Sequence, residues 1–176
     1  MYRQQKQTQN ARFRSTFFPL HLALLTVGEN MMPLGYWTVV SKNPFRFYIS
    51  MGVGNHSLQM LRKFREAALH FMPWSEKSRV VRAGYLSGRD INKAEELGFS
   101  LIPAKELEHT KLVDGADSVF ELVVHSELRN ISTEFAPFIM DVLAVHGDIN
   151  PPDRQPIIFL SEDYFGTLGE KWEYER

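Results

Sequence analysis

The chain has 176 residues, of which 44% are hydrophobic and 23% charged, and its formal net charge is −1 at pH 7. These values are typical of one globular domain and exclude an extended disordered chain. A net charge so close to zero gives no electrostatic reason to expect nucleic acid as a partner. The chain contains no cysteine, which excludes disulfides and cysteine-bound metals and is consistent with a cytoplasmic location.

The N-terminal segment divides into a polar arm and an apolar run. Residues 1–14 are rich in glutamine and arginine, and we expect a flexible, solvated arm ahead of one domain at residues 15–176. A partner-docking role for this arm is the alternative. The apolar run at 17–27 is shorter than the ~20 residues of a membrane span, and no signal-peptide cleavage site follows it. We therefore predict a buried strand at 20–27 and no membrane association.

A hairpin is predicted in the first third of the chain. The runs at 36–41 and 45–51 are β-branched and aromatic, and Lys42-Asn43-Pro44 separates them. Residues 30–35 (NMMPLG) are expected to form an irregular turn ahead of the first strand. A loop of this composition beside aromatic residues suits a flat aromatic ligand.

A glycine-rich turn, Gly52-Val53-Gly54-Asn55, connects this hairpin to a predicted helix at 57–68. Together with His56 and Ser57 it is similar to the dinucleotide-binding fingerprint. However, Ser57 stands where the third glycine belongs, and strand–helix alternation stops after one unit. A structural strand-to-helix turn is therefore the favoured interpretation, and a single-unit dinucleotide binder is the alternative.

The rest of the chain contains more strands than helices. A short strand is expected at 69–72, a loop-rich basic region at 74–90, a helix at 91–97 capped by Asp90 and ended by Gly98, and a helical turn at 103–107. Three further strands are predicted at 118–127, 138–146 and 156–160. Because strands mostly follow strands, the pattern favours an antiparallel barrel or sandwich over a wound parallel sheet.

Few residues suggest acid–base or metal chemistry, and we assign no catalytic residue and no metal ligand. The six histidines do not occur at metal-binding spacing, and no nucleophile elbow is visible. The segment Ser87-Gly88-Arg89 offers backbone donors and a guanidinium just before a predicted helix, which suits a phosphate group.

Several motifs in order resemble the flavin reductase-like FMN-binding split-barrel family, and more closely its flavoredoxin-type branch. Residues 30–44 (NMMPLGYWTVVSKNP) are similar to the family pattern N-x-M-P/T-x-S/G-x-W/F-T-x-V-S followed by a proline turn. Residues 87–104 (SGRDINKAEELGFSLIPA) and the C-terminal segments FIMDVLAVHGD and IIFLSEDYFGTLG look like later family motifs. The resemblance covers about residues 17–170.

This resemblance implies a mostly β protein with short helices, an antiparallel split β-barrel that forms a homodimer with FMN near the interface. It also implies NADH or NADPH as a transient electron donor, in a flavin reductase or a flavoredoxin-like electron-transfer protein with an electron-accepting partner protein. A non-enzymatic split-barrel protein that binds flavin or another planar ligand is the alternative.

The cofactor-binding residues are carried over by position. Contacts with the flavin ring are expected from Asn30 and from backbone groups of Met32, Pro33 and Gly35. The ring, the ribityl chain or the phosphate would be lined by Tyr36, Trp37, Thr38 and Ser41. His56 or Ser57 would approach the cofactor, Arg89 and Lys93 would face the ring edge or the phosphate, and Phe165 would cover the ring.

Three positions depart from the family pattern. Gly35 replaces a serine and removes a hydroxyl donor, His70 stands where the family usually has asparagine, and Arg46 with Tyr48 makes the second hairpin strand more polar.

Overall fold

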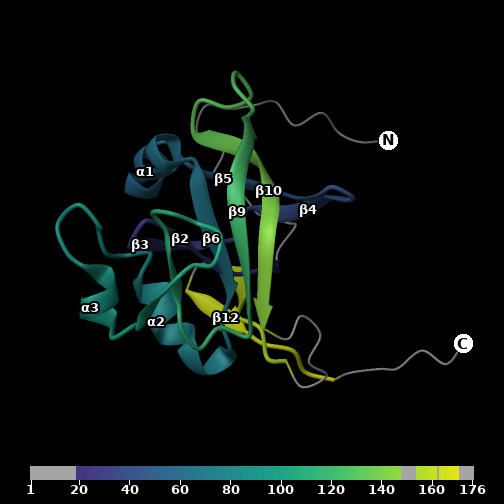
Figure 1. Cartoon of the computed structure of the whole chain (residues 1–176). Helices are drawn as coiled ribbons and strands as arrows, with labels where there is room; N and C mark the ends of the chain where they lie inside the picture. Colours follow the sequence, from purple (N-terminus) through teal and green to yellow (C-terminus); the bar gives the residue numbers. More distant parts are fainter. Residues whose placement is uncertain (1–18, 148–153, 162, 171–176) are drawn as a thin grey trace, which may run out of the picture.

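The computed structural model describes residues 19–147, 154–161 and 163–170, and Figure 1 shows their arrangement. Antiparallel strands dominate, and the short helices α1, α2 and α3 lie beside the sheet (Figure 1). Among these residues, no helix is long and apolar enough to cross a membrane. The arm predicted at 1–14 lies outside the described residues.

The largest unit is a seven-stranded sheet in which each neighbouring pair of strands is antiparallel. Its spatial order is β3-β2-β6-β9-β10-β5-β4. The strands are β2 (Ala23–Val27), β3 (Asn30–Leu34), β4 (Trp37–Lys42), β5 (Phe45–Gly52), β6 (Glu66–Phe71), β9 (Ser118–Glu127) and β10 (Phe135–Gly147). Short connections join β2 to β3, β4 to β5 and β9 to β10, as antiparallel pairing allows. The predicted antiparallel, mostly β architecture and the predicted hairpin are therefore confirmed.

The inner face of this sheet forms the main hydrophobic core. On β10, the buried Phe138 and Met140 alternate with a half-exposed residue, which is the pattern of a strand covered on one face. Four aromatic rings pack edge to face with centroids 4.9–5.9 Å apart: Trp37, Phe47, Phe71 and Phe120. Because each ring pair adds about 0.5–1.5 kcal/mol beyond area burial, this cluster stabilises the contact between β4, β5, β6 and β9.

Helix α1 (His56–Phe64) closes one end of this core with the buried side chains of Leu58 and Leu61. It ends at Arg65, whose φ of 62° lies in the left-handed region. The helix was expected to continue to residue 68, and this prediction is wrong because Glu66 starts β6, which pairs with β9.

The smaller elements surround a second core. They are β1 (Leu20–His21), the 3-10 helix η1 (Trp74–Glu76), α2 (Lys77–Arg82), α3 (Lys93–Leu97), β7 (Leu101–Pro103), β8 (Lys111–Val113), β11 (Ile158–Ser161) and β12 (Tyr164–Gly166). Buried Val80 of α2, Leu97 of α3 and Ile157 meet there against Leu24 of β2. The C-terminal strands thus pack close to the N-terminal strand, with β1 paired to β11.

Several local predictions are wrong. Residues 30–34 form a strand rather than an irregular turn, because each of them pairs with a residue of β2. Residues 77–82 form α2 inside a segment predicted to be loop. Residues 103–107 form no helical turn: β7 ends at Pro103 and an irregular loop follows.

Helix α3 begins two residues later than predicted. The side chain of Asn92, rather than that of Asp90, accepts hydrogen bonds from the amides of Ala94 and Glu95 at 3.1 and 3.3 Å. Gly98 ends the helix at a φ of 69°, as the sequence predicts.

Two buried carboxylates hold the irregular loop before β8 against the sheet. Glu66 accepts three backbone N–H groups of residues 108–110 at 2.6–3.1 Å. Glu121 accepts the amides of residues 105 and 106 at 2.9 and 2.7 Å, and it lies 2.5 Å from Nε2 of His146. Burial alone would raise the pKa of Glu121, but these donors hold it below its usual value.

His70 is a fully buried histidine in β6. Its Nδ1 donates to the carbonyl oxygen of Leu24, 3.1 Å away, so its Nε2 accepts the N–H of Val113 at 2.9 Å. Desolvation by burial lowers the pKa of His70 to about 4, although the bond to the Leu24 carbonyl acts in the opposite direction. The ring is therefore neutral in the folded protein at neutral pH.

The buried His70 makes the stability of the fold dependent on pH. Its pKa is lower in the folded chain than in the unfolded chain, so the unfolded chain binds more protons as the pH falls below about 6.5. We expect this residue to remove about 2–3 kcal/mol of unfolding free energy between pH 7 and pH 4.5. Urea unfolding of the wild type and of His70→Asn at both pH values measures the effect. The variant should lose clearly less stability on acidification, and an equal loss in both proteins would contradict this role.

Candidate functional site

Three cavities lie side by side along β3 and the start of β4. Pro33 and Gly84 line both the first and the second cavity. Leu20, Gly35 and Tyr36 line both the second and the third. The three cavities are therefore neighbours, and we call them together the β3 groove.

The first cavity, of about 340 Å³, brings together residues that are far apart in the sequence. Its walls are the start of β3, the start of α1 and the segment 83–93 between α2 and α3. Seven of the predicted site residues line it: Asn30, Met32, Pro33, His56, Ser57, Arg89 and Lys93. The fold thus assembles more than half of the predicted site in one place.

Two polar atoms of this cavity are buried and have no hydrogen-bond partner among the described residues, Oδ1 of Asn30 and Nδ1 of His56. The other end of the Asn30 amide is fixed, because Nδ2 donates to Oγ of Ser57 at 2.8 Å. A buried polar atom without a partner costs about 1–3 kcal/mol. Both atoms therefore point to a ligand that forms hydrogen bonds with them.

Glycines shape the wall opposite β3. A Cβ atom on Gly88 would lie 2.0 Å from Oδ1 of Asn30, and one on Gly84 would lie 2.9 Å from Cγ of Pro33. The backbone of the segment 83–93 therefore approaches β3 so closely that a side chain at Gly88 would displace the Asn30 amide.

The start of α1 is suited to an anion. No side chain caps this helix, and its first turn contains no acidic residue. The guanidinium of Arg89 lies nearby, where it donates to the carbonyl oxygen of Gly54 at 3.2 Å. Free N–H groups at a helix start and an adjacent arginine are the usual donors to a phosphate.

Lys93 is almost completely buried in the wall of the first cavity, with 6% of its surface exposed. Its Nζ donates to the carbonyl oxygens of Met31 and Ala83, both at 2.8 Å. Desolvation by burial lowers its pKa. An ammonium group has three N–H donors, so one donor is available to a ligand. A contact of Lys93 with the flavin remains a prediction.

The other two cavities are more apolar. The second, of about 320 Å³, is lined mainly by apolar and aromatic side chains, among them Leu20, Tyr36, Tyr85, Phe159 and Phe165. The third, of about 420 Å³, continues past Tyr36 to Thr38 and Phe135. The rings of Tyr36 and Phe135 meet edge to face at 5.4 Å. A flat ring system suits this part of the groove.

Two of the predicted residues contribute differently from the rest. The indole of Trp37 packs against the core ring of Phe71, and its Nε1 donates to the carbonyl oxygen of His21 at 2.8 Å, so its surface in the third cavity is limited. Ser41 lines none of the three cavities, because it lies at the far end of β4 opposite Arg46.

Sequence reasoning missed Gly84, Tyr85 and Phe159, which line the second cavity. The first two lie in a segment predicted to be loop, and the sequence gives no sign that the turn after α2 places them near β3. Gly88 was noted as a backbone donor to phosphate, whereas its structural role is to leave space for Asn30.

The fold is a mostly β, antiparallel sheet with a groove along one edge strand, and comparison with known proteins identifies the family that shares this fold. Residues 14–167 match the model of the flavin reductase like domain. The chain therefore belongs to the flavin reductase-like family, as the motifs in its sequence indicate. No curated protein matches it.

Solved structures share the fold at low sequence identity. The FMN-binding protein from Thermus thermophilus with bound p-hydroxybenzaldehyde has a TM-score of 0.84 at 20% identity, covering 99% of this chain and 100% of that one. Flavoredoxin from Methanosarcina acetivorans has a TM-score of 0.82 at 15% identity, covering 95% of both chains. Nitrilotriacetate monooxygenase component B from Bacillus cereus has a TM-score of 0.82 at 17% identity, covering 97% of this chain and 95% of that one. The predicted split-barrel fold is thereby confirmed.

The contact between Gly88 and Asn30 can be tested by substitution. In Gly88→Ala the new methyl group must displace the Asn30 amide, so we expect FMN affinity to fall about tenfold or more, the usual cost of a lost buried hydrogen bond with added strain. Fluorescence titration with FMN measures the change. Gly169→Ala is the matched control, since a Cβ there meets no atom within 4 Å. Equal affinity of the two variants would show that Asn30 has no part in binding.

Proposed function

We propose that this protein is an FMN-binding flavoprotein that accepts electrons from NADH or NADPH, as a flavin reductase or a flavoredoxin-like electron carrier. The observation that carries the proposal is the pair of buried, unpartnered atoms, Asn30 Oδ1 and His56 Nδ1, in a cavity beside an uncapped helix start. The cavity supplies hydrogen-bonding groups and positively charged groups for an anion, and the adjoining cavities supply aromatic surface. FMN has matching phosphate, polar and flat aromatic parts.

Each wall of the β3 groove has a part in this proposal. The start of α1 and the guanidinium of Arg89 hold the phosphate. Asn30, oriented by Ser57, accepts a hydrogen bond from the ligand's polar edge. Pro33, Gly35 and Tyr36 form the surface for the ring, and Phe165 limits the entry of water from the C-terminal side.

The redox chemistry comes from the cofactor rather than from side chains. Bound FMN supplies hydride and electron transfer, and a flavoprotein needs no acid–base residue for it. The part of the chain that the structure describes has no group of three His, Asp or Glu side chains arranged to hold a metal ion. The residues of the groove bind and orient the cofactor and leave the end of the third cavity near Phe135 for a substrate.

The wild-type protein tests this function directly. We expect the purified protein to bind FMN with a change in its visible spectrum, and to oxidise NADH or NADPH in the presence of FMN. The measurements are a spectral titration with FMN and the loss of nicotinamide absorbance. Failure to bind FMN would overturn the proposal. Flavin binding without nicotinamide oxidation would favour the alternative, a split-barrel protein that binds flavin without catalysis.

We also propose that the protein is a homodimer. Val40 of β4 and Leu143 of β10 are 52% and 48% exposed on strands of the main sheet, and burial of such side chains against a second copy would remove apolar surface from water. Light scattering after size-exclusion chromatography measures the mass. We expect a dimer, and Leu143→Lys should shift it toward the monomer. A monomeric wild type would contradict this proposal and leave flavin binding by one chain to be tested separately.

A further inference from the structure

A second groove lies on the barrel outside the predicted site. It has a volume of about 490 Å³ and is bounded by the C-terminal end of α1 and the hairpin between β9 and β10. Its charged lining consists of Arg62, Arg65, Arg129 and Glu127, and we call it the arginine groove.

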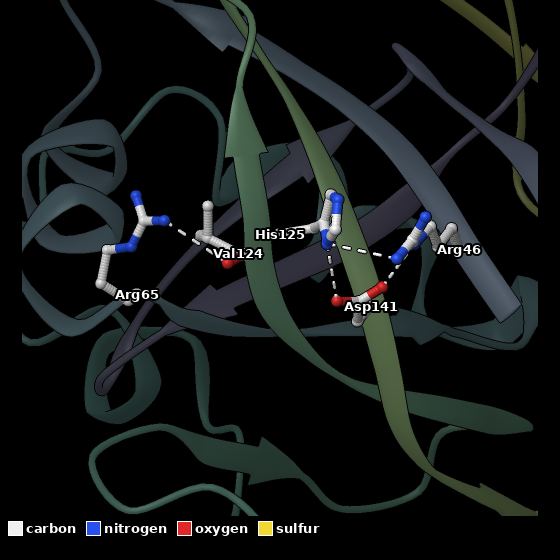
Figure 2. Close-up of polar contacts among 5 residues, drawn as sticks. All are labelled: Arg46, Arg65, Val124, His125 and Asp141. Carbon is white, nitrogen blue, oxygen red and sulfur yellow. Dashed lines mark hydrogen bonds and ion pairs between the residues drawn. The ribbon is translucent and has the colours of Figure 1, made fainter. Parts of the chain in front are cut away.

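The positive charges of the arginine groove exceed its negative charge. Glu127 pairs with Arg62 at 2.6 Å and, more loosely, with Arg129 at 3.8 Å. Arg65 donates one long hydrogen bond, of 3.4 Å, to the carbonyl oxygen of Val124, and Figure 2 shows its guanidinium standing beside β9. The groove is thus lined by three guanidinium groups and one carboxylate, which is an excess of two positive charges in a chain of net charge −1.

The backbone at two lining residues is unusual. Arg65 and Asn130, both with a φ of 62°, are the non-glycine residues in the left-handed region among the described residues. Both line the arginine groove. This backbone conformation is rare for arginine and common for glycine. The substitution Arg65→Gly therefore removes the side chain without disturbing the end of the helix.

The arginine groove adjoins the β3 groove. Ser132, Phe135 and Pro137 line both the arginine groove and the third cavity. The ring of Phe135 also contacts that of Tyr36, so it stands between the flat apolar surface and the arginines. An elongated ligand with a ring at one end and phosphates at the other fits this arrangement.

We propose that the arginine groove binds the adenosine phosphates of the nicotinamide dinucleotide while its nicotinamide lies in the β3 groove. This inference rests on the proposed function, because it assigns a place to the electron donor. Guanidinium groups bind phosphate oxygens through paired N–H donors. NADPH has one phosphate more than NADH, so the excess of positive charge favours NADPH.

The main test removes Arg65 by the substitution Arg65→Gly, which suits the left-handed backbone there. Calorimetry with adenosine 2′,5′-bisphosphate and with ADP, on the full chain without flavin, measures binding to the arginine groove. We expect the Kd of both nucleotides to rise about tenfold in the variant, as for the loss of a charge-assisted hydrogen bond. The KM for NADPH should rise similarly, and FMN affinity should not change.

Two further variants make the result specific. Glu127→Gln frees Arg62 and Arg129 from their partner and should tighten binding of the bisphosphate. Lys63→Ala removes a positive charge from the same helix outside the groove and should have no effect. A response to Lys63→Ala equal to that of Arg65→Gly would show general electrostatic attraction and overturn the site.

The outcomes separate this inference from the proposed function. If the wild type oxidises NADPH with FMN but Arg65→Gly has an unchanged KM and unchanged nucleotide affinity, the arginine groove is not the site and the function stands. If the wild type binds the bisphosphate through Arg65 but does not bind FMN, the function fails and the phosphate site stands. No nucleotide binding by the wild type overturns the inference.

Discussion

The buried ammonium group of Lys93 is the contact on which the geometry of the site depends. It joins the carbonyl oxygen of Met31 in β3 to that of Ala83 at the end of α2. These two carbonyls belong to opposite walls of the first cavity. Because burial disfavours its charge, the group is stable there through the strong hydrogen bonds that it donates. One side chain thus ties β3 to the segment that carries Gly88.

Much of the fold follows from patterns that are local in sequence. The hairpin of β4 and β5 and the long strand β9 are defined by β-branched and aromatic runs with clear breaks, and the structure has them where they were predicted. The wrong predictions occur where contacts between residues far apart in the sequence decide the local structure. Residues 30–34 contain a proline, which suggests a turn, yet pairing with β2 makes them a strand. Such tertiary pairing outweighs local preference, and a single sequence does not reveal it.

The candidate site, too, could be predicted only in part, because contacts between distant segments decide how its side chains are placed. Family motifs pointed to half of the residues that line the first cavity, since these motif positions lie together in the fold. The motifs did not predict the hydrogen-bond partners or the orientation of the side chains at these positions. Lys93 was expected to offer its charge to the ligand, but it uses two donors on carbonyls, and Trp37 turns its ring toward the core. Hydrogen-bond partners such as these come from segments 10 to 62 residues away in the chain, so spacing alone does not predict them.

The loop that Glu66 and Glu121 hold behaves differently from most loops. Backbone amides in irregular segments usually exchange their protons with solvent quickly, because water reaches them. Here the five backbone amides of residues 105, 106 and 108–110 donate to the carboxylates of Glu66 and Glu121, which are buried. Their protons should exchange as slowly as those of the neighbouring strands. This irregular part of the chain should therefore be as rigid as the sheet against which it packs.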